Sequence, residues 1–401
     1  MIDFELLPAT KQGLKGTHAL AAGLFRKIAR YYDDHEHDKV QELYDMVETM
    51  KKAASAPKKE EKEEKPAEAK PAPRLEPSVA GVVSAEEMAW GDAGIMLCFP
   101  TAGLGNAAIQ AVGTPEQKTR LGGKFTAMAI TEPGTGSDTA AVTTTAKLDP
   151  DTNEWIINGE KIFITSGDRC EAVVVWATLD KSIGRAAIKS FVVEKGSPGM
   201  TLTKVEDKLG IRASDTASIV FEDCRIPYDN ILGSPEIKER KKGLGGAMAT
   251  FDATRPTVAA MAIGVARAAL EFTKQKLEEE GYTFPYDRGQ HQLSAIQKDM
   301  LDMEVNLEVA RLLIWRAAAM MDKGIRNSLE ASMSKAKAGR AATLVTQKCL
   351  EILGSQGYGC NWLVEKWMRD CKINDIFEGT GQIQMLIIAR NILGFTRDQL
   401  K

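Results

Sequence analysis

The hydrophobic period of the chain changes twice, and this change most limits the folds that it can adopt. Early apolar residues such as Leu20, Leu24 and Ile28 recur at three- and four-residue spacing, as on one face of a helix. Between residues 127 and 226 they gather instead in short β-type runs, and the helical spacing returns from about Arg255 to Leu393. This order indicates an α+β chain that is mainly α-helical.

The middle block contains several runs rich in β-branched and aromatic residues. These runs are Ala127–Thr131, Trp155–Thr165, Ala172–Leu179, Ala187–Glu194 and Ser218–Ile226. Inside the second run Asn158 precedes Gly159, and both residue types accept the positive φ angles of a type I′ turn. We therefore expect a β-hairpin that turns at these two residues.

A stretch of unusual composition interrupts the first helical region. From Ala53 to Arg74 no apolar side chain except proline is larger than alanine, and Lys58 to Lys65 contains only lysine and glutamate. Such a segment cannot bury enough surface to offset the entropy lost on ordering, so we expect a mobile linker at residues 53–77. The expected domains are an N-terminal helical domain, a β-domain and a C-terminal helical bundle, at residues 1–126, 127–235 and 236–401.

The composition excludes several classes of protein. The 52 basic and 55 acidic residues give a net charge of −3, which points neither to nucleic acid nor to an anionic membrane surface. No apolar run is long enough to form a membrane span, and the N-terminus lacks the pattern of a secretory signal. The six cysteines show no C-x-x-C spacing, so we expect reduced thiols and a cytoplasmic protein.

Histidines are rare in this chain, and two of the four lie close together. His35 and His37 stand among Asp33, Asp34 and Glu36, where a metal site is conceivable. No cysteine or further histidine completes a ligand set, so we favour a solvated helix end and expect no metal.

Three polar, glycine-containing segments carry the residues best suited to chemistry. The first, Thr131 to Asp138, reads TEPGTGSD and follows a β-type run. Its glycines and hydroxyls suit close approach to a ligand, although an ordinary glycine-rich turn has the same composition. It is not a dinucleotide-binding motif, because Thr139 takes the place of the last glycine and strands rather than a helix follow.

The second segment, FDATRP, opens the long helical region. Asp252 suits a helix N-cap and Pro256 suits a first helical turn, so a purely structural role would explain both residues.

The third segment, Phe377 to Gln384, reads FEGTGQIQ and lies between helical stretches. Asp375 and Glu378 are acidic residues in apolar surroundings, where desolvation raises the pKa of a carboxyl group toward that of a general base. Gly379 and Gly381 give the loop flexibility. The alternative is that Glu378 caps the next helix.

Taken together, these segments and four further motifs resemble the acyl-CoA dehydrogenase family in order and spacing. The motifs are ITEPGTGSD, INGEKIFIT, SDTASIVFEDCRIP, FDATRP, EILGSQGYG, VEKWMRD and FEGTGQIQ. The resemblance covers nearly all of the chain after residue 80. It implies the fold of that family, with a helical N-terminal domain, a central β-domain, a C-terminal four-helix bundle and FAD held between them.

The resemblance also implies roles for individual residues, with Glu378 as the general base. It places the following residues at FAD: Thr131, Ser137, Phe163, Ile164, Thr165, Thr380 and Gln382. It places the following residues at acyl-CoA: Ser137, Asp252, Arg255, Glu378 and Gly379. Some branches of the family carry the base at the position of Thr254, but threonine cannot act as a base at neutral pH.

The implied reaction is α,β-dehydrogenation of an acyl-CoA thioester to a trans-2-enoyl-CoA, as in fatty-acid β-oxidation. Glu378 would take the α-proton while a hydride leaves the β-carbon for flavin N5. The backbone N–H of the base and a flavin ribityl hydroxyl would activate the thioester carbonyl, and an electron-transferring flavoprotein would accept the electrons. A same-fold acyl-CoA oxidase, a non-catalytic scaffold subunit and an acyl-CoA-binding protein without turnover remain alternatives.

Several positions depart from the family pattern. Phe163 stands where a tryptophan is usual, and Met128 where a tyrosine is common. The arginine and glutamine that reach FAD across the subunit interface align with Gly281 and Glu351, which offer no positive charge to the pyrophosphate. We therefore expect a heterotetramer with a related acyl-CoA dehydrogenase subunit rather than a homotetramer, unless a basic residue such as Arg288 replaces the arginine.

Overall fold

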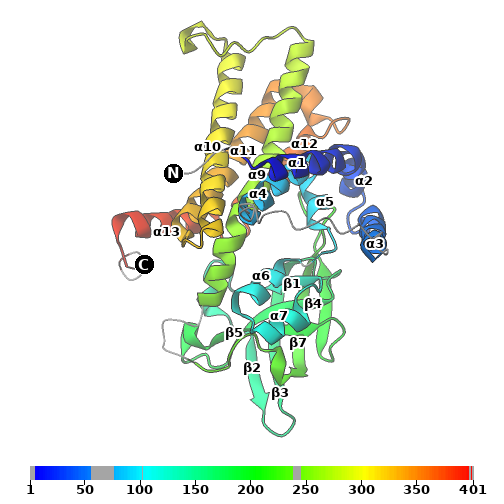
Figure 1. Cartoon of the computed structure of the whole chain (residues 1–401), viewed down its shortest axis with the longest axis vertical. Helices are drawn as coiled ribbons and strands as arrows, with labels where there is room; N and C mark the ends of the chain where they lie inside the picture. The colour runs from blue at the N-terminus through cyan, green and yellow to red at the C-terminus, as the bar shows by residue number, and fades with distance from the viewer. Residues whose placement is uncertain (1–4, 56–75, 102, 238–244, 397–398, 400–401) are drawn as a thin grey trace, which may run out of the picture.

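The computed structural model describes residues 5–55, 76–101, 103–237 and 245–396, together with residue 399. N-terminal helices, a central sheet and C-terminal helices follow one another along the chain (Figure 1). This arrangement confirms the fold class that the sequence predicts. None of the described helices is long and apolar enough to cross a membrane.

The N-terminal region consists of helices that pack above and beside the sheet (Figure 1). They are α1 (Pro8–Leu20), α2 (Arg26–Asp34), α3 (Gln41–Ser55), α4 (Pro77–Gly91), α5 (Ala93–Leu97), α6 (Gly103–Val112) and α7 (Pro115–Leu121). Of the expected linker at 53–77, residues 56–75 lie outside the described residues. The described helices reach into both ends of this range, since α3 continues to Ser55 and α4 begins at Pro77.

The central sheet has seven strands in the order β1-β4-β2-β3-β7-β6, with β5 paired to β4. The strands are β1 (Thr126–Ala129), β2 (Thr145–Asp149), β3 (Glu154–Thr165), β4 (Ala172–Thr178), β5 (Ile188–Glu194), β6 (Met200–Val205) and β7 (Thr216–Pro227). Every residue of β4 is buried, which explains its unbroken apolar run. The sequence does not predict β2 or β6, because neither has the apolar run of a buried strand: β2 has one buried residue and β6 has none.

The hairpin predicted at Asn158-Gly159 is wrong, since β3 continues through both residues without turning. Gly159 lies instead at a bulge in the pairing with β7. A Cβ atom on it would lie 2.4 Å from Oγ1 of Thr144, so glycine is needed for close packing rather than for a turn. The β2–β3 hairpin turns after Asp149.

The C-terminal region is built on three long helices (Figure 1). Its helices are α9 (Gly245–Glu279), α10 (Ala295–Asp322), α11 (Ser328–Tyr358), α12 (Val364–Cys371) and α13 (Gly381–Leu393). α9, α10 and α11 pack on one another, and α13 packs on α11. Because α9 starts at Gly245, Pro256 lies inside the helix and Asp252 is not its N-cap. The interpretation of these two residues as the cap and first turn of the helix is therefore wrong.

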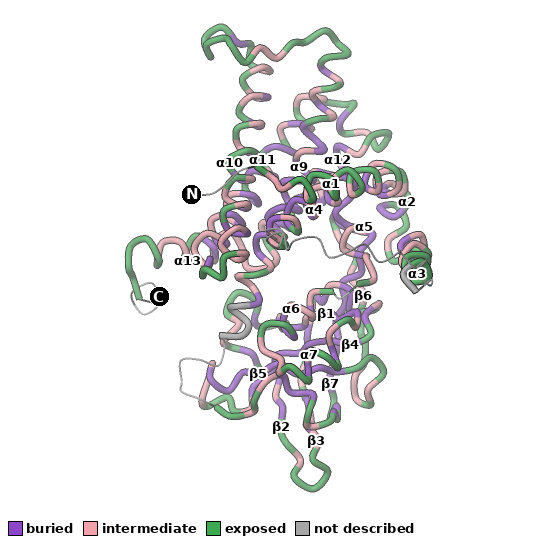
Figure 2. Tube along the Cα trace, in the orientation of Figure 1, coloured by how far each residue is buried: buried purple, intermediate pink, exposed green. Residues whose placement is uncertain are grey.

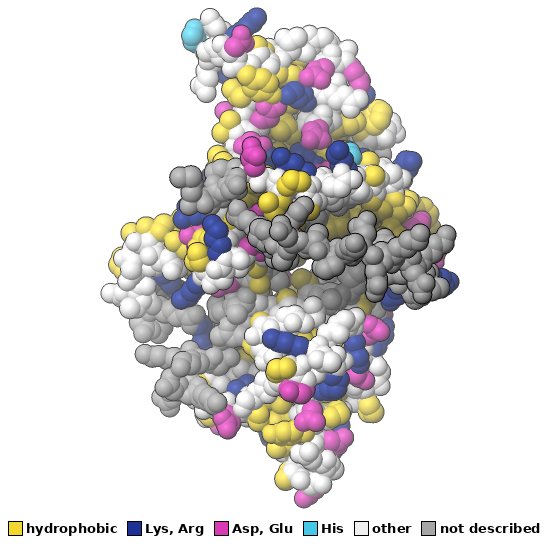
Figure 3. Space-filling model, viewed as in Figure 1, with side chains coloured by type: hydrophobic (Ala, Val, Ile, Leu, Met, Phe, Trp, Pro, Cys, Tyr) yellow, Lys and Arg dark blue, Asp and Glu magenta, His cyan; other side chains and the backbone are white. Residues whose placement is uncertain are grey.

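One apolar core joins the N-terminal and C-terminal helices. Val82 and Val83 of α4 belong to the same buried cluster as Ile263 of α9. A Cβ atom on Gly264 would lie 2.2 Å from the carbonyl oxygen of Glu86, so glycine lets α4 and α9 approach closely. Figure 2 shows this region as buried, whereas α13 is largely half-buried or exposed. Figure 3 shows basic and acidic side chains interspersed on the same face of the molecule.

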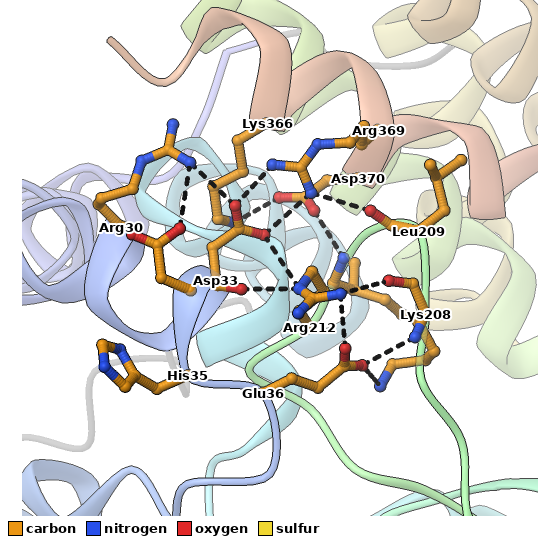
Figure 4. Close-up of polar contacts among 12 residues, drawn as sticks. Arg30, Asp33, His35, Glu36, Lys208, Leu209, Arg212, Lys366, Arg369 and Asp370 are labelled. Carbon is orange, nitrogen blue, oxygen red and sulfur yellow. Dashed lines mark hydrogen bonds and ion pairs between the residues drawn. The ribbon is translucent and has the colours of Figure 1, made fainter. Parts of the chain in front are cut away.

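A cluster of buried charges joins α12 to the rest of the molecule (Figure 4). Lys366 is fully buried, and its Nζ lies 2.5 Å from a carboxylate oxygen of Asp92 and 2.5 Å from one of Asp370. Asp370 also accepts a hydrogen bond of 2.6 Å from the backbone N–H of Ile211, in the loop before β7. This lysine and its two carboxylates therefore link α12 with α5 and with the β-domain.

Arg369, on the same helix, extends the cluster to α2 (Figure 4). Its guanidinium donates to both carboxylate oxygens of Asp33, at 3.0 and 2.5 Å. Arg212 donates to the backbone oxygen of Asp33 at 2.6 Å and lies 2.7 Å from Glu36. The VEKWMRD motif thus supplies charges that hold the three regions together.

Candidate functional site

Glu378 lies in the loop between α12 and α13, and its backbone is strained. Its φ angle is 56°, and Gly379 follows at 88°. The left-handed region costs a residue with a side chain about 1–2 kcal/mol, and such strain persists where the surroundings hold it. Here Nζ of Lys335 donates to the carbonyl oxygen of Gly379 at 2.7 Å, and Nε2 of Gln384 donates to the same oxygen at 3.0 Å.

Glu378 is half-buried, and the loss of water around its carboxyl group has the largest effect on its ionisation. Desolvation raises the pKa of its carboxyl group, while a hydrogen bond from Thr254 and the charges of Arg255 and Lys335 act in the opposite direction. The hydroxyl of Thr254 donates to Oε2 of Glu378 at 3.0 Å. Burial has the larger effect, so the pKa stays above its usual value, as a general base requires.

The alternative role of Glu378 as a helix cap is taken by another residue. Oγ1 of Thr380 accepts a hydrogen bond of 3.2 Å from the backbone N–H of Ile383 and caps α13. Gln382 is exposed in the first turn of the same helix. The carboxyl group of Glu378 is therefore not used as the cap of α13.

Asp252, which is half-buried, and Arg255, which is buried, form an ion pair beside the base loop. NH1 of Arg255 lies 2.9 Å from Oδ1 of Asp252. The other carboxylate oxygen of Asp252 accepts a hydrogen bond from Ser328, and its backbone oxygen accepts one of 3.3 Å from Asn327. These contacts join α9 to the start of α11, and they place Arg255 near enough for its charge to act on Glu378.

The loop after β1 is anchored by a buried ion pair. Nζ of Lys161 lies 2.7 Å from Glu132 and donates to the backbone oxygen of Ile130 at 3.0 Å. The carboxylate of Glu132 also accepts hydrogen bonds from the backbone and hydroxyl groups of Thr143 and Thr144. Burial alone would raise the pKa of Glu132, but the hydrogen bonds from Lys161, Thr143 and Thr144 lower it to about 2. This carboxylate thus holds the loop in place.

The residues expected at FAD lie on this loop and on the end of β3. The backbone N–H of Ile162 donates to the carbonyl oxygen of Thr131 at 2.9 Å, which brings the loop beside the strand. Phe163 has a φ angle of 56° and is 61% exposed, while Ile164 is buried. Thr131 and Thr165 are half-buried, and Ser137 is exposed. An exposed aromatic side chain on a strained backbone is a suitable surface for a planar ring.

The candidate residues therefore form two groups. One lies on the β-domain, and the other consists of the base loop with the adjoining parts of α9 and α11. In the described part of the chain, the side chains of Thr254, Arg255, Lys335 and Glu378 make no hydrogen bond or ion pair with the β-domain group.

Sequence reasoning missed Lys335 and Gln384, which hold the base loop. Lys335 stands in an alanine-rich helical stretch, and Ala331 and Ala338 lie on the same helix face. A lysine on an apolar helix face was the signal available in the sequence. Nothing in the local pattern pointed to its partner, since Gly379 lies on a separate segment.

The region of His37 contains a group of possible metal ligands. Ligand atoms of Glu36, His37 and Asp207 lie within 4.8 Å of one another. Glu36 already pairs with Lys208 at 2.6 Å and with Arg212 at 2.7 Å, so its charge is compensated. We assign no metal to this group. His35, at the end of α2, is exposed and stacks on Tyr31.

Comparisons with known proteins agree along the chain. Residues 127–224 match the acyl-CoA dehydrogenase middle domain, and residues 241–393 match the acyl-CoA dehydrogenase C-terminal domain. The short-chain specific acyl-CoA dehydrogenase of Bos taurus mitochondria is 42% identical over 288 residues, which cover 70% of this chain and 67% of that protein. The corresponding rat, mouse and human proteins are each matched over 64% of their length.

Solved structures share the fold over most of the chain. Butyryl-CoA dehydrogenase from Megasphaera elsdenii is 29% identical, with a TM-score of 0.81 over 98% of this chain and 100% of that one. A glutaryl-CoA dehydrogenase from Mycobacterium smegmatis, solved in complex with FADH2, is 25% identical, with a TM-score of 0.69 over 79% of this chain and 80% of that one. On these matches and on the three-part fold, the chain belongs to the acyl-CoA dehydrogenase family.

Proposed function

We propose that this protein is an FAD-dependent acyl-CoA dehydrogenase in which Glu378 removes the α-proton of the substrate. The observation that carries this proposal is the environment of Glu378. Its carboxyl group has a raised pKa because of burial, it accepts a hydrogen bond from Thr254, and it stands on a loop held by Lys335 and Gln384. A carboxyl group with these properties suits general-base catalysis near neutral pH.

The backbone of the base loop supports a second role at the substrate. In the described residues the backbone N–H of Glu378 donates to no protein acceptor, so it is free to bind a ligand oxygen. A thioester carbonyl placed there would receive a hydrogen bond as negative charge develops on its oxygen. Glu378 would then both stabilise that oxygen and accept the α-proton. Gly379 and Arg255 would line the same substrate site.

The β-domain group fits FAD. Phe163 offers an exposed aromatic face, Ile164 supports it from the core, and Thr131, Ser137 and Thr165 bring hydroxyl groups to the same region. We propose that these residues, with Thr380 and Gln382 of the base-loop group, hold the cofactor. When bound, FAD supplies the acceptor for the hydride that leaves the β-carbon.

We propose a short acyl-CoA as the substrate class, because the relatives that match the chain include enzymes named short-chain specific from Bos taurus and Clostridium acetobutylicum. The product would be a trans-2-enoyl-CoA, and an electron-transferring flavoprotein would be the electron acceptor. The runner-up function is that of a same-fold oxidase, in which O₂ replaces that protein.

We also propose that the chain works in an oligomer with a related subunit. Gly281, in the turn after α9, has a φ angle of 91°, a conformation that an arginine would adopt only with strain. Glu351 is 69% exposed and pairs with Lys348 at 2.9 Å. Neither position thus offers a free positive charge to a pyrophosphate. α13 exposes apolar side chains that suit a subunit contact, namely Met385, Leu386, Ile392 and Leu393.

The test is anaerobic reduction of the FAD-loaded protein by a series of acyl-CoA thioesters. Bleaching of the flavin absorbance by butyryl-CoA, and loss of this bleaching in Glu378→Gln, would support the proposal. Hydrogen peroxide formed under air at the rate of substrate consumption would favour the oxidase. Binding of every thioester without bleaching would contradict both functions.

FAD content of the chain purified alone, compared with the chain purified with a related subunit, tests the oligomer.

A further inference from the structure

Lys335 is a buried cation that the proposed reaction does not yet use. It lies on α11, its side chain is 1% exposed, and its Nζ donates to the carbonyl oxygen of Gly379 at 2.7 Å. In the part of the chain that the structure describes, no carboxylate oxygen lies within 4.0 Å of this nitrogen. Burial of an ammonium group without an ion pair is unfavourable, so its presence beside the base calls for a reason.

The hydrogen bond by itself does not supply that reason. The carbonyl oxygen of Gly379 already accepts a hydrogen bond from Gln384 at 3.0 Å, so Lys335 is not needed to satisfy it. An apolar side chain of similar length, such as methionine, would fill the same volume without the cost of a buried charge. What methionine would not provide is the positive charge.

The charged groups around the base come from three elements. α9 contributes Arg255, but Asp252 lies 2.9 Å away and offsets its charge. α11 contributes Lys335, and the segment after α12 contributes Asp375. The charges of Asp375 and Glu378 both act on Lys335. Lys335 is therefore the positive charge near the base without an ion-pair partner in the described structure.

We propose that Lys335 is a positioning residue for the dehydrogenation: its ammonium group fixes the strained loop through Gly379 and keeps the neighbouring Glu378 carboxylate ionised. This inference rests on the proposed role of Glu378 as the base. Burial favours the protonated form of Glu378, which cannot accept the α-proton. The charge of Lys335 opposes that effect and favours the carboxylate form of Glu378.

The experiment compares Lys335→Met, which keeps length but removes the charge, with Lys335→Arg, which keeps the charge. Lys348→Met serves as the control, because Lys348 lies on the same helix in a partly exposed ion pair with Glu351. The readout is the pH dependence of flavin bleaching by butyryl-CoA in a single anaerobic turnover. We expect the rate of Lys335→Met relative to wild type to fall about tenfold between about pH 8 and about pH 6. Lys335→Arg should largely restore the wild-type profile, and Lys348→Met should match it.

A uniform loss of rate at every pH, or an unchanged dependence of the rate on pH, would overturn the proposal. Loss of a purely structural lysine would not change how steeply the rate falls toward acid pH. If Lys335→Met fails to fold, Lys335→Gln removes the charge and keeps a hydrogen-bond donor, and the same criterion applies to it.

A second measurement does not depend on turnover. Infrared difference spectra against pH should show the protonated carboxyl band of Glu378, identified by its loss in Glu378→Gln. The midpoint of this band should lie at higher pH in Lys335→Met than in wild type, and equal midpoints would reject the inference. Failure of wild type to bleach with any thioester would instead reject the proposed function.

Discussion

Lys335 and Lys366 are both buried lysines of the C-terminal helices, but the charges around them differ. Lys366 is fully buried and lies 2.5 Å from the carboxylates of Asp92 and Asp370. Lys335 is buried as deeply, and its polar partner in the described structure is the carbonyl oxygen of Gly379. Burial alone would lower both pKa values. The charges of Asp370 and Asp92 raise that of Lys366 above its usual value, whereas that of Lys335 falls to about 8.

This difference distinguishes two uses of a buried charge. The ion-paired cluster around Lys366 joins α5, α12 and the β-domain, and it therefore fixes their relative positions (Figure 4). The uncompensated charge of Lys335 adds little to stability and acts on a neighbouring carboxyl group. Ionisable groups whose pKa is strongly shifted by their surroundings, as that of Lys335 is, are common at functional sites. The comparison therefore predicts that stability depends on the first region and activity on the second.

The largest effect is expected from Glu378→Gln. If Glu378 is needed for catalysis rather than for folding, this variant should bind FAD and keep the melting temperature within a few degrees of wild type. Removal of a general base commonly lowers the rate by about 10²–10⁴-fold. Single-turnover bleaching by butyryl-CoA measures the loss, and flavin absorbance measures cofactor content. Activity within a few-fold of wild type would remove Glu378 from its proposed role.

The complementary change is Lys366→Met, which should lower stability. It leaves the carboxylates of Asp92 and Asp370 buried without a cation, and breaking such a pair costs about 3–5 kcal/mol. Urea unfolding of the FAD-loaded protein measures the change. Lys348→Met is the matched control, because its ion pair with Glu351 is partly exposed and contributes at most about 1 kcal/mol. Equal stabilities of the two variants would contradict the structural role of the cluster.

Lys335→Met should behave in the opposite way, with unfolding free energy at neutral pH equal to or above that of wild type. The substitution removes an ammonium group whose burial no ion pair offsets. A loss as large as that of Lys366→Met would show that the two lysines do not differ in the manner described.

The stability of Lys335→Met relative to wild type should also depend on pH. The folded-state pKa of Lys335, about 8, lies below the ordinary value of 10.5. Between these values the unfolded chain binds more protons than the folded one, so the lysine becomes less unfavourable as pH rises. The advantage of methionine should be full below about pH 8 and should shrink toward about pH 10. Unfolding curves at several pH values measure it, and a gain that grows with pH would contradict the sign.

The smallest effect is expected from Thr254→Val. The hydroxyl of Thr254 donates to Glu378 at 3.0 Å and favours the carboxylate in the same direction as Lys335. Loss of one hydrogen bond of about 0.5–1.5 kcal/mol corresponds to roughly a two- to tenfold lower rate, greatest at acid pH. Thr257→Val, at an exposed position on the same helix, provides the control. A larger effect than that of Lys335→Met would reverse the ranking of the two groups.

The strands show how far local pattern alone can predict the fold. The sequence predicts a strand at Ala172–Leu179, and β4 occupies Ala172–Thr178, because a strand buried on both faces is apolar throughout. β6 was missed because its residues are mostly exposed and are held by pairing with β7. The hairpin predicted at Gly159 is absent, because a glycine required for close packing has the same sequence signature as a glycine in a turn.

The functional site also combines features that local sequence predicts with contacts between residues far apart in the chain. Glu378 could be proposed from its loop and its motif. Asp252 was instead predicted to be an N-cap, because the first turns of α9, before Phe251, carry no strong local signal of a helix. The contact of Asp252 with Ser328 joins residues far apart in the chain, which no spacing rule anticipates. The pairing of Lys366 with Asp92 is equally remote in sequence.

The sequence by itself determined the order of helical and β regions, most strands, the family resemblance and the proposed base. These features depend on hydrophobic period and short motifs, which are local properties of the chain. The tertiary structure decided which buried lysine is compensated, since charge balance depends on groups that the fold brings together. Lys335 and Lys366 are both lysines in helical stretches of the sequence, and only the fold places carboxylates beside one and the base loop beside the other.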